Sequence, residues 1–170
     1  MRLFQLNVHK GSPVSVTEDD LANALRAWGE GMVSISSAYR QGGYEDARNV
    51  ARKLISNLYG YRMGSVLFKP TLSGGANTFR TSEEGALSYF VGGNSDYPDD
   101  SGFAIKGWRE VFSDTKAVFL DEDVGLWMGW VTLVDRNGEA TKVDKSFGYK
   151  LCEGRHLKIV LHHSSLPYVN

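Results

Sequence analysis

The chain contains a single cysteine, Cys152, among its 170 residues. One cysteine cannot form an intramolecular disulfide, and it cannot supply the thiolate set of a structural zinc site. Cys152 precedes Glu153-Gly154, a pair typical of a turn, and no acid–base partner accompanies it in the pattern. We therefore interpret Cys152 as a packing residue near a hairpin tip rather than as a nucleophile.

The chain also lacks an excess of charge of either sign and any long apolar run. Its 19 Lys and Arg are interspersed with 20 Asp and Glu, giving a net charge of −1. Without a basic stripe, nucleic acid is not an expected partner. No apolar run approaches the roughly 18–20 residues that span a bilayer, and residues 1–16 lack the layout of a secretory signal. We expect no membrane association and a cytoplasmic location.

The first half of the chain predicts helices. Thr17-Glu18-Asp19-Asp20 is typical of a helix N-terminus, because threonine caps free N–H groups and acids suit the positive end of the helix dipole. This helix should end near Gln41-Gly42-Gly43. A second helix is expected from Tyr44 to Tyr59, and a short third one from Thr81 to about Phe90. The first helix carries an apolar stripe at spacings of three and four: Leu21, Leu25, Trp28, Met32, Ile35 and Tyr39.

From Phe103 onward the pattern predicts strands. Arg136-Asn137-Gly138-Glu139 indicates a hairpin with a type I′ turn. Ser65–Phe68, closed by Pro70, is expected to be a short strand or extended segment. Helices followed by an antiparallel meander predict an α+β fold in one domain, with 1–15 as an extension and 16–168 as the folded unit. The expected strands are Phe103–Phe112, Lys116–Leu120, Val124–Asp135, Glu139–Leu151 and His156–Ser165.

One expected strand, Val124–Asp135, is apolar on both faces. Alternation puts one apolar set on each side of the strand. One side should pack on the helices, and the other should meet a second subunit, so we expect a homodimer through the sheet. The first set is Leu126, Met128 and Trp130, and the second is Trp127, Val131 and Leu133.

The last strand ends in the polar run His162-His163-Ser164-Ser165. Alternation places His162 and Ser164 on one face and His163 and Ser165 on the other. Adjacent histidines on a strand diverge and cannot chelate one ion, and no Gly-x-Ser-x-Gly elbow is present for a serine hydrolase. From this pattern alone, a structural polar network and a functional site are equally open.

Acidic residues give no clear metal motif. They cluster in two loop-like stretches, Asp96–Asp100 and Asp121–Asp123, which we interpret as solvated loops, while a carboxylate-rich ion site stays open. His156 is separated from His162 by six residues of extended strand, roughly 20 Å, and His9 lies in the N-terminal segment. The sequence therefore predicts no metal cofactor but leaves manganese and zinc open.

Several segments together resemble the iota-class carbonic anhydrases. The most specific are Phe68-Lys69-Pro70-Thr71 and Asp100-Ser101-Gly102-Phe103, while the histidine–serine ending is more widely shared. That family resembles the association domain of calcium/calmodulin-dependent kinase II, and both belong to the nuclear transport factor 2-like (cystatin-like) superfamily. The resemblance extends from about Val16 onward. It implies a cone of N-terminal helices packed on a strongly curved antiparallel sheet.

The resemblance also implies an activity: the reversible hydration of carbon dioxide to bicarbonate, without a metal. By this likeness, Thr71, Tyr89, His162 and Ser164 are the expected catalytic residues. In our hypothesis Thr71 and Ser164 orient the attacking water, and Tyr89 or His162 takes or relays its proton. Histidine, with an ordinary pKa near 6.5, is the natural proton exchanger at neutral pH.

Two other functions stay open at this point. One is an oligomerising module like the kinase association domain, although no kinase or linker accompanies it here. The other is a small-molecule cyclase or isomerase of the same superfamily, which usually needs a pocket carboxylate. The last strand offers no acid on the face of His162, while a helical acid such as Glu45 stays open as that carboxylate. Fold alone cannot choose among these functions.

Overall fold

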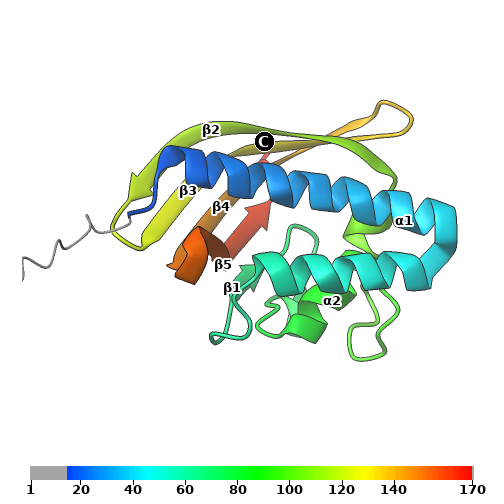
Figure 1. The fold of residues 1–170 in the computed structure, drawn as a ribbon. Coiled ribbons are helices and arrows are strands. Elements are labelled where there is room, and N and C mark those ends of the chain that lie inside the picture. The colour runs from blue at the N-terminus through cyan, green and yellow to red at the C-terminus, as the bar shows by residue number, and fades with distance from the viewer. Residues whose placement is uncertain (1–14, 170) are drawn as a thin grey trace, which may run out of the picture.

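A five-stranded sheet and a long bent helix form the part of the chain that the computed structural model describes, residues 15–169 (Figure 1). His9 and nearly all of the expected extension 1–15 lie outside this range. The elements are α1 (Glu18–Leu58), β1 (Leu67–Lys69), α2 (Glu83–Val91), β2 (Trp108–Leu120), β3 (Val124–Asp135), β4 (Ala140–Cys152) and β5 (His156–Ser165), with short 3₁₀ turns at Gly75–Asn77, Phe103–Ile105 and Glu153–Arg155. The predicted α+β class is confirmed.

Helix α1 begins at the predicted cap and bends at the predicted glycine. The Asp20 amide donates to the Thr17 hydroxyl at 3.2 Å, and the Thr17 amide donates to the Asp20 carboxylate at 2.9 Å. Gly43 has φ of +79°, which breaks the helical path. The second half turns back beside the first (Figure 1). The predicted stripe is buried except for Tyr39, which is 40% exposed, so the stripe ends earlier than expected.

The sheet has the order β1-β5-β4-β3-β2. The meander from β2 to β5 is antiparallel, as predicted. Strand β1 departs from that pattern because it pairs with β5 in parallel, with Phe68 opposite His162. The chain reaches this edge from the end of α1, where Tyr59 bridges to Ile159. The last strand is therefore internal to the sheet, with both of its edges hydrogen-bonded to neighbouring strands.

Two local predictions are wrong. Residues Phe103–Ile105 form a 3₁₀ turn, and the strand that follows is one continuous β2 with a bulge between Thr115 and Ala117. In the β3–β4 hairpin, Gly138 has φ of +87° and Asn137 does not have a positive φ. A type I′ turn needs both, so this turn instead combines an ordinary turn with one left-handed glycine.

The two faces of β3 differ as predicted. Trp127, Val131 and Leu133 are buried on the inner face of the sheet, whereas Leu126 and Met128 are 43% and 57% exposed on the outer face. Figure 1 shows the first half of α1 crossing the sheet. The interior of the domain therefore lies between α1 and the inner face, and that is where β5 presents alternate residues.

Candidate active site

Two hydroxyl groups from distant parts of the chain meet at the inner face. Thr71 follows Pro70 just after β1, and its Oγ1 lies 2.6 Å from the Oγ of Ser164 on β5. Ser164 is fully buried and also donates to the carbonyl oxygen of Asp144 at 3.1 Å. One arrangement satisfies both contacts: Ser164 donates to Asp144, and Thr71 donates to Ser164. This leaves the oxygen of Thr71 free to accept a hydrogen bond.

Tyr89, on α2, lies beside this pair. Its side chain is buried, and its hydroxyl has no hydrogen-bond partner among residues 15–169. Burial raises the pKa of Tyr89 to about 12, and the charge of Asp100 adds to the rise, while the nearby Thr71 side chain and the backbone of Leu72 and Thr71 partly oppose it. The ring stacks on Phe103 with centroids 5.5 Å apart and meets the edge of Phe68 at 5.8 Å. Tyr89 therefore holds a free O–H donor in apolar surroundings.

A small cavity of about 20 Å³ adjoins the ring of Tyr89. That volume suits roughly one water molecule. It is lined by Leu72, Tyr89, Asp99, Asp100, Ser101, Gly102, Phe103 and Lys106.

His162 shares the inner face of β5 with Ser164, as the alternation predicted, while His163 is exposed on the outer face. The ring of His162 lies between Phe68, on which it stacks with centroids 4.3 Å apart, and Phe147, whose tilted ring has its centroid 4.4 Å away. Both ring nitrogens are engaged: Nδ1 lies 3.0 Å from the hydroxyl of Tyr59, and Nε2 lies 2.9 Å from Nζ of Lys145. Among the described residues, no hydrogen bond joins His162 to the hydroxyl groups of Thr71, Tyr89 or Ser164, which we call the hydroxyl cluster.

The surroundings of His162 disfavour its charged form. Burial lowers its pKa well below 6.5, and the charges of Lys145 and His163 lower it further. The imidazole is therefore neutral at physiological pH. Our expectation that it titrates there as an ordinary histidine does not agree with this environment.

Sequence reasoning missed Lys145. This lysine on β4 is 3% exposed and points inward among aromatic rings. Alternation along β4 carried the signal, because Lys145 has the same parity as Val143 and Phe147, which are buried. A lysine on the apolar face of a strand is rare without a function or a partner.

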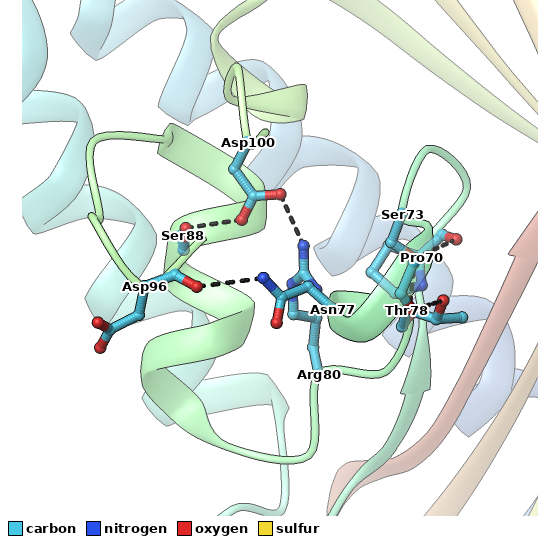
Figure 2. A network of polar contacts seen from close by, with 9 residues as sticks. Pro70, Ser73, Asn77, Thr78, Arg80, Ser88, Asp96 and Asp100 are labelled. Atoms are coloured by element: carbon cyan, nitrogen blue, oxygen red, sulfur yellow. Dashed lines mark hydrogen bonds and ion pairs between the residues drawn. The ribbon is translucent and has the colours of Figure 1, made fainter. Parts of the chain in front are cut away.

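A second buried network fastens the segments that carry Thr71 and Tyr89. Arg80 donates to the carboxylate of Asp100 at 2.7 Å, and the same carboxylate accepts from Ser88, the neighbour of Tyr89, at 2.6 Å. Figure 2 shows these contacts at the end of α2. The side chain of Asp100 is only 5% exposed, so our interpretation of Asp96–Asp100 as a solvated loop is wrong for this residue.

In the loop after β1, Ser73 holds the turn that follows Thr71. Its hydroxyl lies 2.7 Å from the carbonyl oxygen of Thr78 and 3.2 Å from that of Pro70 (Figure 2). Asn77 donates to the carbonyl oxygen of Asp96 at 3.1 Å, which ties this loop to the one after α2. The position of Thr71 is thereby fixed by contacts on both sides.

Neither a metal-ligand cluster nor a membrane-crossing helix is found in residues 15–169. No three His, Cys, Asp or Glu side chains there gather closely enough to hold an ion. Likewise, no helix in that range combines the length and apolar character needed to cross a bilayer.

Known proteins resemble this chain over most of its length. Residues 19–166 match the family described as metal-independent carbonic anhydrase. A protein of that description from Nostoc sp. is 44% identical over 154 residues, covering 91% of this chain and 75% of its own. The crystal structure of a cyanobacterial iota-carbonic anhydrase complexed with bicarbonate is 42% identical, with a TM-score of 0.92 over 94% of this chain and 98% of its own.

A more distant structure shares the fold alone. A calcium/calmodulin-dependent protein kinase II association domain from Xanthomonas campestris is 21% identical, with a TM-score of 0.57 over 94% of each chain. The family match and the Nostoc relative, in contrast, cover nearly all of the described residues. The chain therefore belongs to the metal-independent carbonic anhydrase family.

Proposed function

We propose that this protein catalyses the reversible hydration of carbon dioxide to bicarbonate, without a metal, at the hydroxyl cluster of Thr71, Tyr89 and Ser164. The observation that carries the proposal is the 2.6 Å contact between Thr71 and Ser164 beside the unpartnered hydroxyl of Tyr89. These groups come from the β1 loop, α2 and β5. Such a cluster, buried among aromatic rings, suits a small apolar substrate that becomes an anion.

The three hydroxyls divide two tasks in the reaction. Thr71 and Ser164 orient the attacking water, the free oxygen of Thr71 accepting one of its hydrogens. Tyr89, whose pKa of about 12 keeps it protonated at neutral pH, donates to the oxygen on which negative charge grows. In apolar surroundings a preorganised donor of this kind is worth more than in water.

This assignment leaves the proton acceptor open. Tyr89 is protonated at neutral pH and therefore cannot serve as the base in that form. His162 is neutral, but both of its nitrogens are already occupied. We keep His162 in the site as a residue that links the hydroxyl face of β5 to Lys145 and Tyr59.

Stopped-flow measurement of carbon dioxide hydration, with and without a chelator, tests the proposal. Thr71→Ala, Tyr89→Phe and Ser164→Ala should each lower kcat by roughly 10²-fold in folded protein. Ser165→Ala is the matched control, because its hydroxyl points to the carboxylate of Asp144 at 2.6 Å on the other face of β5. Full activity in the three site variants would overturn the assignment.

We further propose a homodimer through the outer face of the sheet. Phe119, Leu126 and Met128 are exposed there and border a groove of about 330 Å³ that is almost wholly apolar. Exposed apolar patches of this kind are typical of interaction sites. The face is continuous across β2, β3 and β4, so a second copy can cover it by a two-fold arrangement.

The cytoplasmic location expected from the sequence stays a prediction. Cell fractionation with an antibody against the protein tests it.

A further inference from the structure

Lys145 is a buried amine without a carboxylate partner. Its side chain is 3% exposed, and within residues 15–169 no Asp or Glu lies within 4.0 Å of its Nζ. Its neighbours are the Nε2 of His162 at 2.9 Å and the face of Trp28 at 4.7 Å. A buried lysine is costly when charged unless it is paired, so this position needs an explanation.

The strand register places Lys145 beside the hydroxyl cluster. Lys145 is the direct partner of Ser164 across the β4–β5 ladder, and Phe147 is the partner of His162. Directly opposed residues have Cβ atoms roughly 4.5–5.5 Å apart and point to the same face. The side chain of Lys145 therefore begins opposite Ser164 and ends at His162.

Hydrogen bonding around His162 depends on the charge of this amine. The indole N–H of Trp28 can only donate, and it donates to the hydroxyl oxygen of Tyr59 at 3.0 Å. If Tyr59 then donates to Nδ1 of His162, the ring hydrogen sits on Nε2 and needs an acceptor. Only the neutral amine of Lys145 has the lone pair to accept it.

A charged Lys145 imposes the opposite arrangement. An ammonium group only donates, so Nε2 of a neutral His162 must accept and Nδ1 must carry the hydrogen. Tyr59 then accepts from both Trp28 and His162, and its own hydroxyl hydrogen has no partner among the described residues. The hydrogen-bonding groups of Trp28, Tyr59 and His162 in this network are thus all paired only while Lys145 is neutral.

The charged groups around Lys145 do not reverse this preference. Burial lowers its pKa to about 7, and the charge of Lys69 on β1 lowers it too, while Asp144 on β4 opposes the shift. Tyr59, at the end of α1, stays protonated because burial raises its pKa well above 10. His163 lies on the outer face of β5.

We propose that Lys145 is the group that takes up the proton released when carbon dioxide is hydrated, and that its charge sets the tautomer of His162. The inference rests on the proposed function. As the water oxygen bonds to carbon, one water O–H bond breaks and an electron pair of a C=O bond moves onto oxygen. The proton reaches the Tyr59 hydroxyl, the Tyr59 hydrogen passes to Nδ1 of His162, and the Nε2 hydrogen of His162 passes to the amine nitrogen, which becomes an ammonium group. Bicarbonate leaves, and the ammonium returns its proton to solvent.

Nuclear magnetic resonance of the wild-type protein tests the inference without any activity assay. With ¹³Cε-labelled lysine, we expect one lysine, absent from the spectrum of Lys145→Met, to titrate near pH 7. With ¹⁵N-labelled histidine, His162 should stay neutral and shift its hydrogen from Nδ1 to Nε2 as the pH rises through the same midpoint. An unchanged Lys145 ammonium signal between about pH 6 and 9 would overturn the proposal.

Kinetics supply the second test. Wild-type kcat for hydration should fall as the pH drops through about 7, because the reaction needs the neutral amine. Lys145→Met should lose roughly 10²-fold in kcat and this inflection. Lys145→Arg should behave in the same way, because guanidinium stays charged. The control is Lys142→Met, an exposed lysine of the same strand.

The two proposals fail in different ways. An inactive wild-type protein whose Lys145 titrates near pH 7 would sink the proposed function, and with it proton uptake during hydration, but not the control of the His162 tautomer by Lys145. An active protein whose Lys145→Met variant is folded and keeps both its rate and its pH profile would sink only the assignment of Lys145. If that variant does not fold, the wild-type resonance titration still decides.

Discussion

Thr71 and Ser164 are 93 residues apart in the chain, yet their hydroxyl oxygens lie 2.6 Å from each other. The parallel pairing of β1 with β5 brings them together, because it sets Phe68 opposite His162 and carries the next residues of both segments in the same direction. Two short hydroxyl side chains on different elements can hold one water only if both segments are rigid. The hydrogen bonds of Ser73 and the Arg80–Asp100 pair supply that rigidity around Thr71.

The first prediction concerns this pair. Thr71→Val and Ser164→Ala should each lower kcat by roughly 10²-fold, and the double variant should lose little more than either single one. Groups that act as a unit are not additive, because removing one already disables the other. Stopped-flow hydration rates of the wild type, the two single variants and the double variant measure the coupling between the two hydroxyls. Fully additive losses would mean that the two hydroxyls act separately.

The second prediction separates function from stability at Tyr89. Its buried hydroxyl has no hydrogen-bond partner among residues 15–169, so Tyr89→Phe should leave the free energy of unfolding unchanged or raise it by about 1 kcal/mol, while hydration activity falls. Tyr149→Phe is the matched control, because that hydroxyl is also buried and unpartnered. It should show the same stability effect with full activity. Urea unfolding and stopped-flow assays of both variants provide the comparison.

The third prediction concerns the buried ion pair. Asp100→Asn leaves the guanidinium of Arg80 buried without its counter-ion and should cost about 3–5 kcal/mol of unfolding free energy. Arg52→Met removes the long, exposed pair with Glu84 and should change stability by less than about 0.5 kcal/mol. Chemical denaturation measures both. Equal effects would mean that burial of the Arg80–Asp100 pair does not matter to stability.

The fourth prediction is a pH dependence of stability. The pKa of Lys145 is about 7 in the folded protein against an ordinary 10.5, so the unfolded chain binds more protons between these values. Stability therefore rises with pH across that window, relative to Lys145→Met. Below about pH 6.5 the lowered pKa of His162 acts in the same sense, and stability falls as the pH falls. Unfolding midpoints at several pH values check both effects. Wild-type and Lys145→Met stability curves that run parallel above pH 7 would contradict the effect assigned to Lys145.

The fifth prediction tests the outer face. Met128→Lys puts a charge at the centre of the apolar patch and should convert a dimer to a monomer at micromolar concentration, because a buried unpaired charge opposes association. Sedimentation velocity measures the mass of both proteins. Lys53→Met, on α1 away from this face, is the control and should leave the mass unchanged. A wild-type monomer would refute the dimer.

Local rules were enough for the helices and for most of the strands. The Thr17 cap, the break at Gly43 and the shared strand face of His162 and Ser164 all follow from short-range spacing, which depends on backbone geometry alone. The hairpin at Asn137-Gly138 was placed correctly but its turn type was not. Asn-Gly is compatible with more than one turn, and the flanking strands choose between them.

Long-range packing decided the chemistry. From the sequence, His162 was an ordinary histidine near pKa 6.5, and Asp100 was one of several loop acids. His162 is instead buried between Phe68 and Phe147, with Lys145 at one ring nitrogen and Tyr59 at the other. It is therefore a neutral imidazole that links these two side chains. None of these partners is near it in the chain, so no local pattern could reveal the contacts.

The amino-acid sequence by itself determined the helices, the alternation of the strands and the family resemblance, because these depend on neighbours a few residues apart. Only the tertiary structure decided that Thr71 meets Ser164 and that Lys145 ends at His162. The reason is physical: pKa values and hydrogen-bond roles depend on burial and on partners that only the folded chain assembles.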